Sequence, residues 1–216
     1  TPSAIADGNY SITATATDTV GNASVEATPQ NIVIDTVKPS APVISSASLT
    51  NDTTPVVSGT AEVGAGITAV IAGATYTTTA TEGSWSIDTG SATPASGTLA
   101  VNANGTNSVS VTATDAAGNV SAAGTQTLTV DTTAPTVTID TIAGDGTLNA
   151  SEAAGPIVVS GTTTAEDGQT VTLGVNGKTF AGLASGGEFS ISLSAVEVGT
   201  LTGTETFTAD VSDKAG

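Results

Sequence analysis

The sequence has 216 residues and is strongly acidic, with 20 Asp and Glu against three Lys, no His, no Cys and a formal net charge of -17. Without His or Cys the chain cannot build a zinc site of the usual N/S type, a disulfide, or a Ser–His–Asp or Cys–His relay. Its negative charge disfavours nucleic-acid phosphate and anionic membrane surfaces as partners. No apolar run approaches the roughly 20 residues that span a bilayer, and the first residues are not expected to be a signal peptide. Its first residues are typical of the middle of a protein, so we expect a window of something longer.

The composition favours β-structure. Thr and Val are abundant, and β-branched side chains suit a pleated, half-buried surface. Charged residues make up only 11%, which is too few for a typical charged disordered tail. A low-complexity Thr/Ala linker is the alternative, but the apolar/polar alternation in many segments favours folded strands.

The chain repeats itself with a period of about 97 residues. TATDTVGN at 15–22 returns as TATDAAGN at 112–119, and weakly as DVSDKAG at the C-terminal end. VVSGT occurs at 56–60 and again at 158–162, and GSWSI at 83–87 returns as GEFSI. These matches occur in the same order, which predicts tandem units of one fold. We expect a partial first unit at 1–36, a complete second unit at 37–132 and a third unit at 133–216 that lacks its last strand.

Strand signals follow one another closely within the second unit. We expect strands at 41–47, 54–60, 67–72, 74–80, 84–88 together with 98–103, 107–115 and 120–131.

The segment 107–115 alternates most clearly, and the equivalent segments of the other two units share its pattern. The residues predicted to face inward are Val109, Val111 and Ala113 in the second unit, Phe207, Ala209 and Val211 in the third, and Ile12, Ala14 and Ala16 in the first. One dry face, about seven strands and no helical period predict an all-β fold of two-sheet antiparallel sandwiches without a disulfide.

Several segments resemble one known family. VDTTAPTVTID, TDAAGNVS, SGTAEVGAG and SGTTTAEDGQTVTLGVNGKTF are similar to the bacterial immunoglobulin-like tandem repeats of giant RTX-type adhesins, which Gram-negative bacteria secrete. The resemblance covers essentially the whole chain. It implies tandem immunoglobulin-like domains that extend an adhesin from the cell surface, with calcium ions at the domain junctions. The single Trp85 is interpreted as core packing on its strand.

The carboxylates are expected to gather where one unit follows another. In such a sandwich the loops after the second and the penultimate strands lie at the end where the chain enters. At the first junction this end gathers Asp35, Glu62 and Asp115; at the second it gathers Asp131, Glu166, Asp167 and Asp213. Clustered carboxylates repel unless a cation offsets their charge, and calcium tolerates irregular sets of oxygen ligands. The sequence therefore predicts Ca²⁺ at both junctions, with Asp18 as the equivalent ligand in the first unit.

Another interpretation of these aspartates is structural. The pattern DxxGN is a good turn sequence, because Asp accepts local backbone N–H bonds and Gly or Asn adopts positive φ. Asp7, Asp52 and Asn104 are weaker candidates that could reach a junction from the preceding unit. The remaining acids are expected elsewhere: Asp140, Asp145 and Glu152 facing a following unit, and Glu26, Glu82, Asp88, Glu188, Glu197, Glu205 and Asp210 on the solvated surface.

The sequence predicts a structural spacer outside the bacterial cell. Its partners would be neighbouring repeats of the same chain, and other domains would bind the adhesive ligand. A glycan- or protein-binding module is the main alternative, and a repeat of a phage or surface-layer protein is another. Enzymatic activity is not expected, because carboxylates are the only acid–base groups and nothing indicates a substrate cleft.

Overall fold

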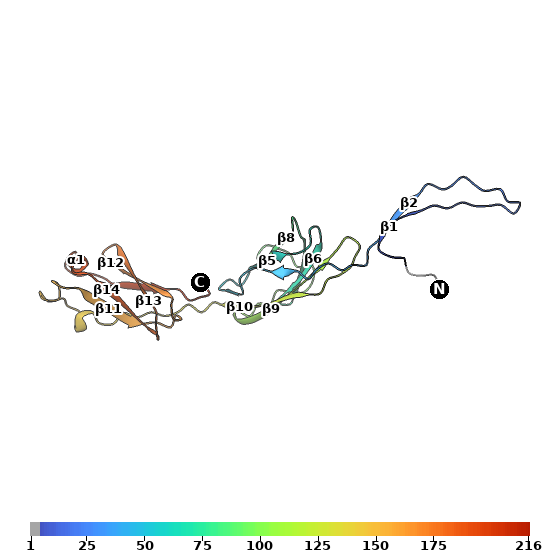
Figure 1. Ribbon diagram of the computed structural model, residues 1–216. Helices are drawn as coiled ribbons and strands as arrows, with labels where there is room; N and C mark the ends of the chain where they lie inside the picture. Colours follow the sequence, from blue (N-terminus) through green and yellow to red (C-terminus); the bar gives the residue numbers. More distant parts are fainter. Residues whose placement is uncertain (1–4) are drawn as a thin grey trace. The chain divides into compact units, whose positions relative to one another are not determined.

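A computed structural model describes residues 5–216, and almost all of its regular structure is strand (Figure 1). The chain divides into two compact units. The first runs to Ser48 and also contains Thr54–Val101 and Asn107–Leu128; the second contains Leu49–Thr53, Asn102–Thr106 and Thr129–Gly216. We name three parts by their strands: the N-terminal hairpin (β1 and β2), the middle sandwich (β3 to β10) and the C-terminal sandwich (β11 to β15).

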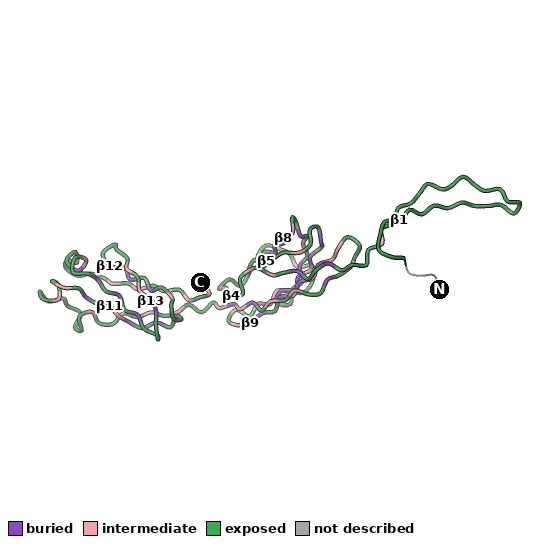
Figure 2. Tube along the Cα trace, viewed as in Figure 1, coloured by how far each residue is buried: buried purple, intermediate pink, exposed green. Residues whose placement is uncertain are grey.

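The N-terminal hairpin consists of β1 (Gly8–Ile12) and β2 (Gln30–Ile34), which pair antiparallel from Gly8 opposite Ile34 to Ile12 opposite Gln30. Its side chains are almost all exposed (Figure 2). Ile12, Ala14 and Ala16, which were expected to share the inward face of a partial unit, are all exposed, Ile12 by 55%. A two-stranded hairpin has no second layer to cover its apolar side.

The middle sandwich contains eight strands in two sheets. One sheet has the order β3-β5-β8 and the other the order β4-β10-β9-β6-β7, in which β10 and β4 run parallel. The strands are β3 (Val43–Ile44), β4 (Leu49–Thr50), β5 (Val56–Thr60), β6 (Gly66–Ile71), β7 (Ala74–Thr79), β8 (Ser84–Asp88), β9 (Asn104–Thr114) and β10 (Gly124–Asp131).

The apolar alternation packs these two sheets together. Val109, Val111 and Ala113 are buried as predicted, and Trp85 is only 3% exposed, which confirms its place in the core. A Cβ on Gly59 would lie 1.9 Å from the backbone oxygen of Val43 and 2.8 Å from the Trp85 ring. Only glycine at this position lets β3 and the indole approach β5 so closely.

Two expected strands of the middle sandwich differ from the prediction. The expected strand at 41–47 is the short β3, and a second short strand, β4, follows in the other sheet. The segment 98–103 is not a strand. It follows Pro94 and Gly97, whose φ of 74° interrupts extended structure, and its contact with the sandwich includes a bond from Ala100 N to Ala72 O at 3.0 Å.

The C-terminal sandwich follows the same plan. Its sheets have the orders β11-β14 and β13-β12-β15, and a Cβ on Gly161 would lie 1.8 Å from Thr138 O and 2.7 Å from the Phe189 ring. Gly161 and Phe189 thus repeat the arrangement of Gly59 and Trp85. The elements are η1 (Ile142–Gly144), β11 (Ile157–Thr162), β12 (Thr170–Val175), β13 (Lys178–Leu183), β14 (Glu188–Leu193), α1 (Ala195–Val198) and β15 (Thr208–Val211). The all-β sandwich prediction is confirmed.

The short helix α1 was not predicted. Ser194 and Glu197 form a capping box: the Glu197 side chain accepts from Ser194 N at 2.6 Å, and Ser194 Oγ accepts from Glu197 N at 3.4 Å. The pKa of the Glu197 carboxyl is lowered, mainly by the Ser194 side chain and then by the Ser194 backbone N–H. Glu197 is therefore a structural cap and not the plain surface charge that the sequence suggested.

Candidate metal-binding junctions

Three aspartates that the repeated sequence aligns, Asp18, Asp115 and Asp213, each stand at the start of a tight turn. In the turn after β9, Asp115 Oδ1 accepts from Ala117 N at 2.9 Å and Asn119 N at 2.8 Å, and Oδ2 accepts from Asn119 Nδ2 at 2.9 Å. Asp18 binds Val20 N and Asn22 in the same way. These bonds stabilise the ionised carboxylates and lower both pKa values, with the Asn side-chain amide contributing most. These local bonds to backbone N–H groups are those that the turn interpretation of DxxGN predicts.

The first junction follows β2. Asp35 Oδ1 accepts from Val37 N at 3.0 Å, and the backbone oxygen of Asp35 accepts from Asn119 Nδ2 at 3.0 Å. The turn of Asp115 thus reaches the linker through its asparagine. Glu62 is exposed in the loop between β5 and β6.

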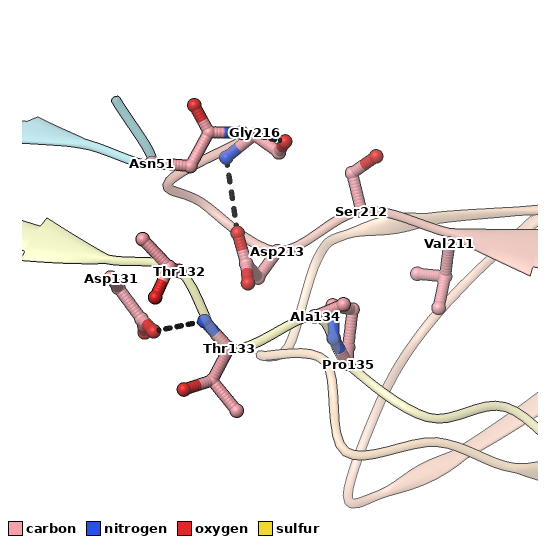
Figure 3. A pocket seen from close by; sticks show the side chains of 10 residues that line it. All are labelled: Asn51, Asp131, Thr132, Thr133, Ala134, Pro135, Val211, Ser212, Asp213 and Gly216. Carbon is pink, nitrogen blue, oxygen red and sulfur yellow. Dashed lines mark hydrogen bonds between the residues drawn. The ribbon is translucent and has the colours of Figure 1, made fainter. Parts of the chain in front are cut away.

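The second junction contains a pocket of about 140 Å³ that is lined by two of the predicted ligands, Asp131 and Asp213 (Figure 3). Asp131 ends β10, and its Oδ1 accepts from Thr133 N at 2.9 Å. Asp213 follows β15, and its Oδ1 accepts from Ala215 N at 2.9 Å and Gly216 N at 3.0 Å. The other lining residues are uncharged: Asn51, Thr132, Thr133, Ala134, Pro135, Val211, Ser212 and Gly216.

The other two acids predicted for this junction point to different places. Glu166 Oε2 accepts from Lys214 N at 3.2 Å, so its carboxylate lies beside the turn of Asp213. Asp167 Oδ1 accepts from Gly186 N at 2.7 Å, in the turn between β13 and β14. Within residues 5–216, no group of three or more acidic side chains is arranged to hold a metal ion.

Sequence reasoning gave little weight to the residues that contact the linkers from the preceding repeat. Asp7 Oδ1 accepts from Thr36 N at 3.1 Å and Thr36 Oγ1 at 2.9 Å. Asn104 Oδ1 accepts from Thr132 N at 2.9 Å and from the hydroxyls of Thr132 and Thr133 at 3.1 Å each. Asp7 and Asn104 are about one repeat period apart, which is the sequence signal that they share a role.

Asn51 makes another contact that sequence reasoning missed. Its backbone N donates to Ala215 O at 3.1 Å, and its side chain donates to Gly216 O. The loop after β4 therefore meets the turn that carries Asp213. Nothing in the local sequence of Asn51 indicates this contact, because it depends on backbone groups of a distant loop.

Comparison with known families identifies the sandwiches. A family model described as a bacterial Ig-like domain matches residues 43–132, and a second model, bacterial Ig-like domain group 3, matches residues 98–179. The first match spans the whole middle sandwich from β3 to β10. No curated protein matches the chain. None of the helices in the described part of the chain has the length and hydrophobicity of a membrane span.

Several solved structures are similar in sequence. A Ca²⁺-stabilised adhesin that helps an Antarctic bacterium bind ice is 28% identical over 95% of this chain and 56% of that chain, with a TM-score of 0.39. A 1.5-MDa bacterial ice-binding adhesin is 28% identical over 96% of this chain and 74% of that chain, with a TM-score of 0.37.

A third structure is a single domain. It is a bacterial immunoglobulin-like domain from the M. primoryensis ice-binding adhesin, 34% identical over 36% of this chain and 92% of that domain, with a TM-score of 0.29. The chain thus spans just over half the length of the first of these structures and most of the other two. The two family matches overlap between residues 98 and 132 and together run from residue 43 to residue 179. The chain belongs to the bacterial immunoglobulin-like domain family, which is not a family of enzymes.

Proposed function

We propose that this chain is a spacer segment of a bacterial cell-surface adhesin, outside the cell, whose repeats are stiffened by calcium at their junctions. Family membership and the repeat period of about 97 residues support a tandem array. In this proposal the repeats are 1–36, 37–132 and 133–216. Neighbouring repeats are the partners of each unit, and the adhesive ligand binds to other domains.

The observation that carries the calcium proposal is the pocket shared by Asp131 and Asp213. One carboxylate belongs to the linker and the other to the loop of the sandwich that follows it. An ion that binds both would therefore fix the linker to the next repeat. Each carboxylate uses Oδ1 for a bond within its own turn, but an ionised carboxylate has about four acceptor positions.

The donor chemistry fits a hard divalent cation. Carboxylate, hydroxyl and backbone oxygens surround the pocket, and no Lys is among its lining residues. Calcium takes six to eight such oxygens in flexible geometry, whereas magnesium requires near-ideal octahedral sites. Asp131 and Asp213 would hold the ion, with Glu166 next to Asp213 as a further ligand. The ion would supply positive charge that offsets the repulsion between these acids.

The affinity that this role requires is modest. Extracellular calcium modules bind in the range of about 10⁻⁴ to 10⁻³ M, which suits a protein that works outside the cell. Under the proposal, the junction becomes stiffer when the chain meets calcium outside the cell.

A ligand-binding module is less well supported. Binding surfaces are usually enriched in exposed aromatic residues. Here Tyr76, Trp85 and Phe189 are buried, and the other aromatic residues are half-buried: Tyr10, Phe180 and Phe207.

Limited proteolysis of the linker tests the proposal. Calcium should protect residues 132–135 from cleavage, and Asp131→Ala should abolish this protection because it removes the linker's carboxylate. Asp210→Asn is the matched control, since Asp210 is exposed on β15, three residues before Asp213. Cleavage of the wild type that is the same in calcium and in EDTA would contradict the calcium role.

A further inference from the structure

We propose that the linkers are also held by a hydrogen-bond lock that needs no metal. At the first junction the lock is formed by Asn119 of the following repeat and Asp7 of the preceding repeat. At the second junction Asn104 of the preceding repeat occupies the position equivalent to Asp7. This inference goes beyond the calcium proposal and holds whether or not an ion binds.

The following side of the lock is the amide of Asn119. Its Nδ2 donates one bond to the backbone oxygen of Asp35 at 3.0 Å and one to Asp115 Oδ2 at 2.9 Å. These two bonds use both hydrogens of the amide. The NH₂ group therefore bridges a linker carbonyl and a loop carboxylate.

The preceding side of the lock accepts hydrogen bonds. One oxygen of Asp7 receives the backbone N–H and the hydroxyl of Thr36, and one oxygen of Asn104 receives both of these groups from Thr132. The Asp7 carboxylate and the Asn104 amide thus both use a side-chain oxygen to accept hydrogen bonds from the linker. Since no bond to the linker needs the Asn104 NH₂ group, Asp and Asn are interchangeable at this position.

At the first junction the two sides meet on neighbouring residues. Asn119 binds Asp35, and Asp7 binds Thr36. Pro39, a few residues later, is buried and has a fixed φ. Residues 35–39 therefore have protein contacts that do not require an ion.

The same substitution, Asn to Asp, should have opposite effects on the lock at positions 104 and 119. At position 104 the lock needs an acceptor, so Asn104→Asp should preserve it and Asn104→Ala should remove it. At position 119 the lock needs a donor, so Asn119→Asp should remove it, and the new carboxylate would also repel Asp115. A role that depended only on side-chain shape would predict that both Asp variants behave alike.

Amide hydrogen exchange by NMR tests the lock on the full chain in EDTA, where calcium cannot contribute. The N–H of Thr132 should exchange about 2- to 10-fold faster in Asn104→Ala than in wild type, because a typical net hydrogen bond is worth about 0.5–1.5 kcal/mol. Asn104→Asp should keep the wild-type rate, and Asp7→Asn should likewise keep the rate of Thr36. For Asn119→Asp, ¹⁵N relaxation should show faster motion of residues 36–38, with the second linker unchanged.

The control is Asn176→Asp, in the turn between β12 and β13, where the side chain donates to Thr200 O at 3.2 Å. This variant should leave both linkers unchanged. Core amides such as those of Val111 and Leu173 report whether a variant remains folded. Wild-type exchange at Thr132 in Asn104→Ala, or loss of protection in Asn104→Asp, would overturn the acceptor side. Wild-type motion of residues 36–38 in Asn119→Asp would overturn the donor side.

Discussion

The two linkers start with the same local turn, and each is followed by a loop whose turn begins with an aspartate, Asp115 or Asp213. Asp35 and Asp131 each bind the backbone N–H two residues further on, at 3.0 and 2.9 Å. At the first linker the following loop presents an amide, Asn119, whose bond is to a backbone oxygen. At the second linker the following loop presents a carboxylate, Asp213, on a pocket shared with the linker acid. The first linker therefore shows a bond from a loop amide to its backbone, and the second shows a pocket that a linker carboxylate and a loop carboxylate both line.

Calcium removal should separate the two junctions most strongly. We expect EDTA to increase cleavage of residues 132–135 about 10-fold or more, because an ion at ten times its dissociation constant stabilises the bound state by about that factor. Cleavage of residues 36–39 should also increase, but less, since the bond from Asn119 to Asp35 holds that linker from the following repeat without an ion. Mass spectrometry of timed digests would measure both rates. Equal sensitivity of the two linkers would remove the distinction between them.

The two neighbouring acids of the β11–β12 loop provide a finer test. Glu166→Gln should weaken calcium binding about 3- to 10-fold, because calcium sites are tuned by ligand charge and Glu166 lies beside the Asp213 turn. Asp167→Asn should have a smaller effect, since the Asp167 carboxylate binds Gly186 in another turn. Calcium titrations of the two variants give the comparison. A larger loss in Asp167→Asn would show that this loop turns toward the linker when it binds the ion.

Titration of Asp115 should show a smaller but well-defined effect. Its pKa is lowered from 3.8 mainly by the Asn119 side chain, so Asn119→Ala should raise it toward that value. A lowered folded-state pKa stabilises the fold above the unfolded pKa, and this contribution is lost as the pH falls through the folded value. The first linker should therefore loosen below about pH 4. Side-chain NMR titration measures the pKa, and an unchanged value in Asn119→Ala would contradict this account of the turn.

The sequence predicted the strands wherever alternation and turn residues agreed. The segments 54–60, 67–72, 74–80 and 84–88 correspond closely to β5 through β8, because each strand buries alternate residues against a facing sheet. The N-terminal hairpin has the same alternation but stays exposed, since burial depends on a second layer. The helix α1 had a readable signal in Ser194-Ala-Val-Glu197, whose S-x-x-E spacing is that of a capping box.

The candidate site was partly predictable for a similar reason. Sandwich topology places the linker and the turn after the penultimate strand at one end, so Asp131 and Asp213 were expected together, and both line the same pocket. The direction in which each carboxylate points depends on nearby N–H groups, as for Asp167 and Gly186. Asn119 donates to the backbone oxygen of Asp35, and every residue type has such an oxygen. The residue type at position 35 therefore could not indicate this bond.

Calorimetric titration of the whole chain with calcium tests the central claim most directly. We predict saturable binding in the millimolar range or tighter, with at least one ion lost in the double variant Asp131→Ala/Asp213→Ala and the wild-type stoichiometry kept in Asp210→Asn. The double variant removes both carboxylates of the second-junction pocket without touching a buried core residue. Absence of binding to the intact chain at millimolar calcium, or the same stoichiometry in the double variant, would contradict the account.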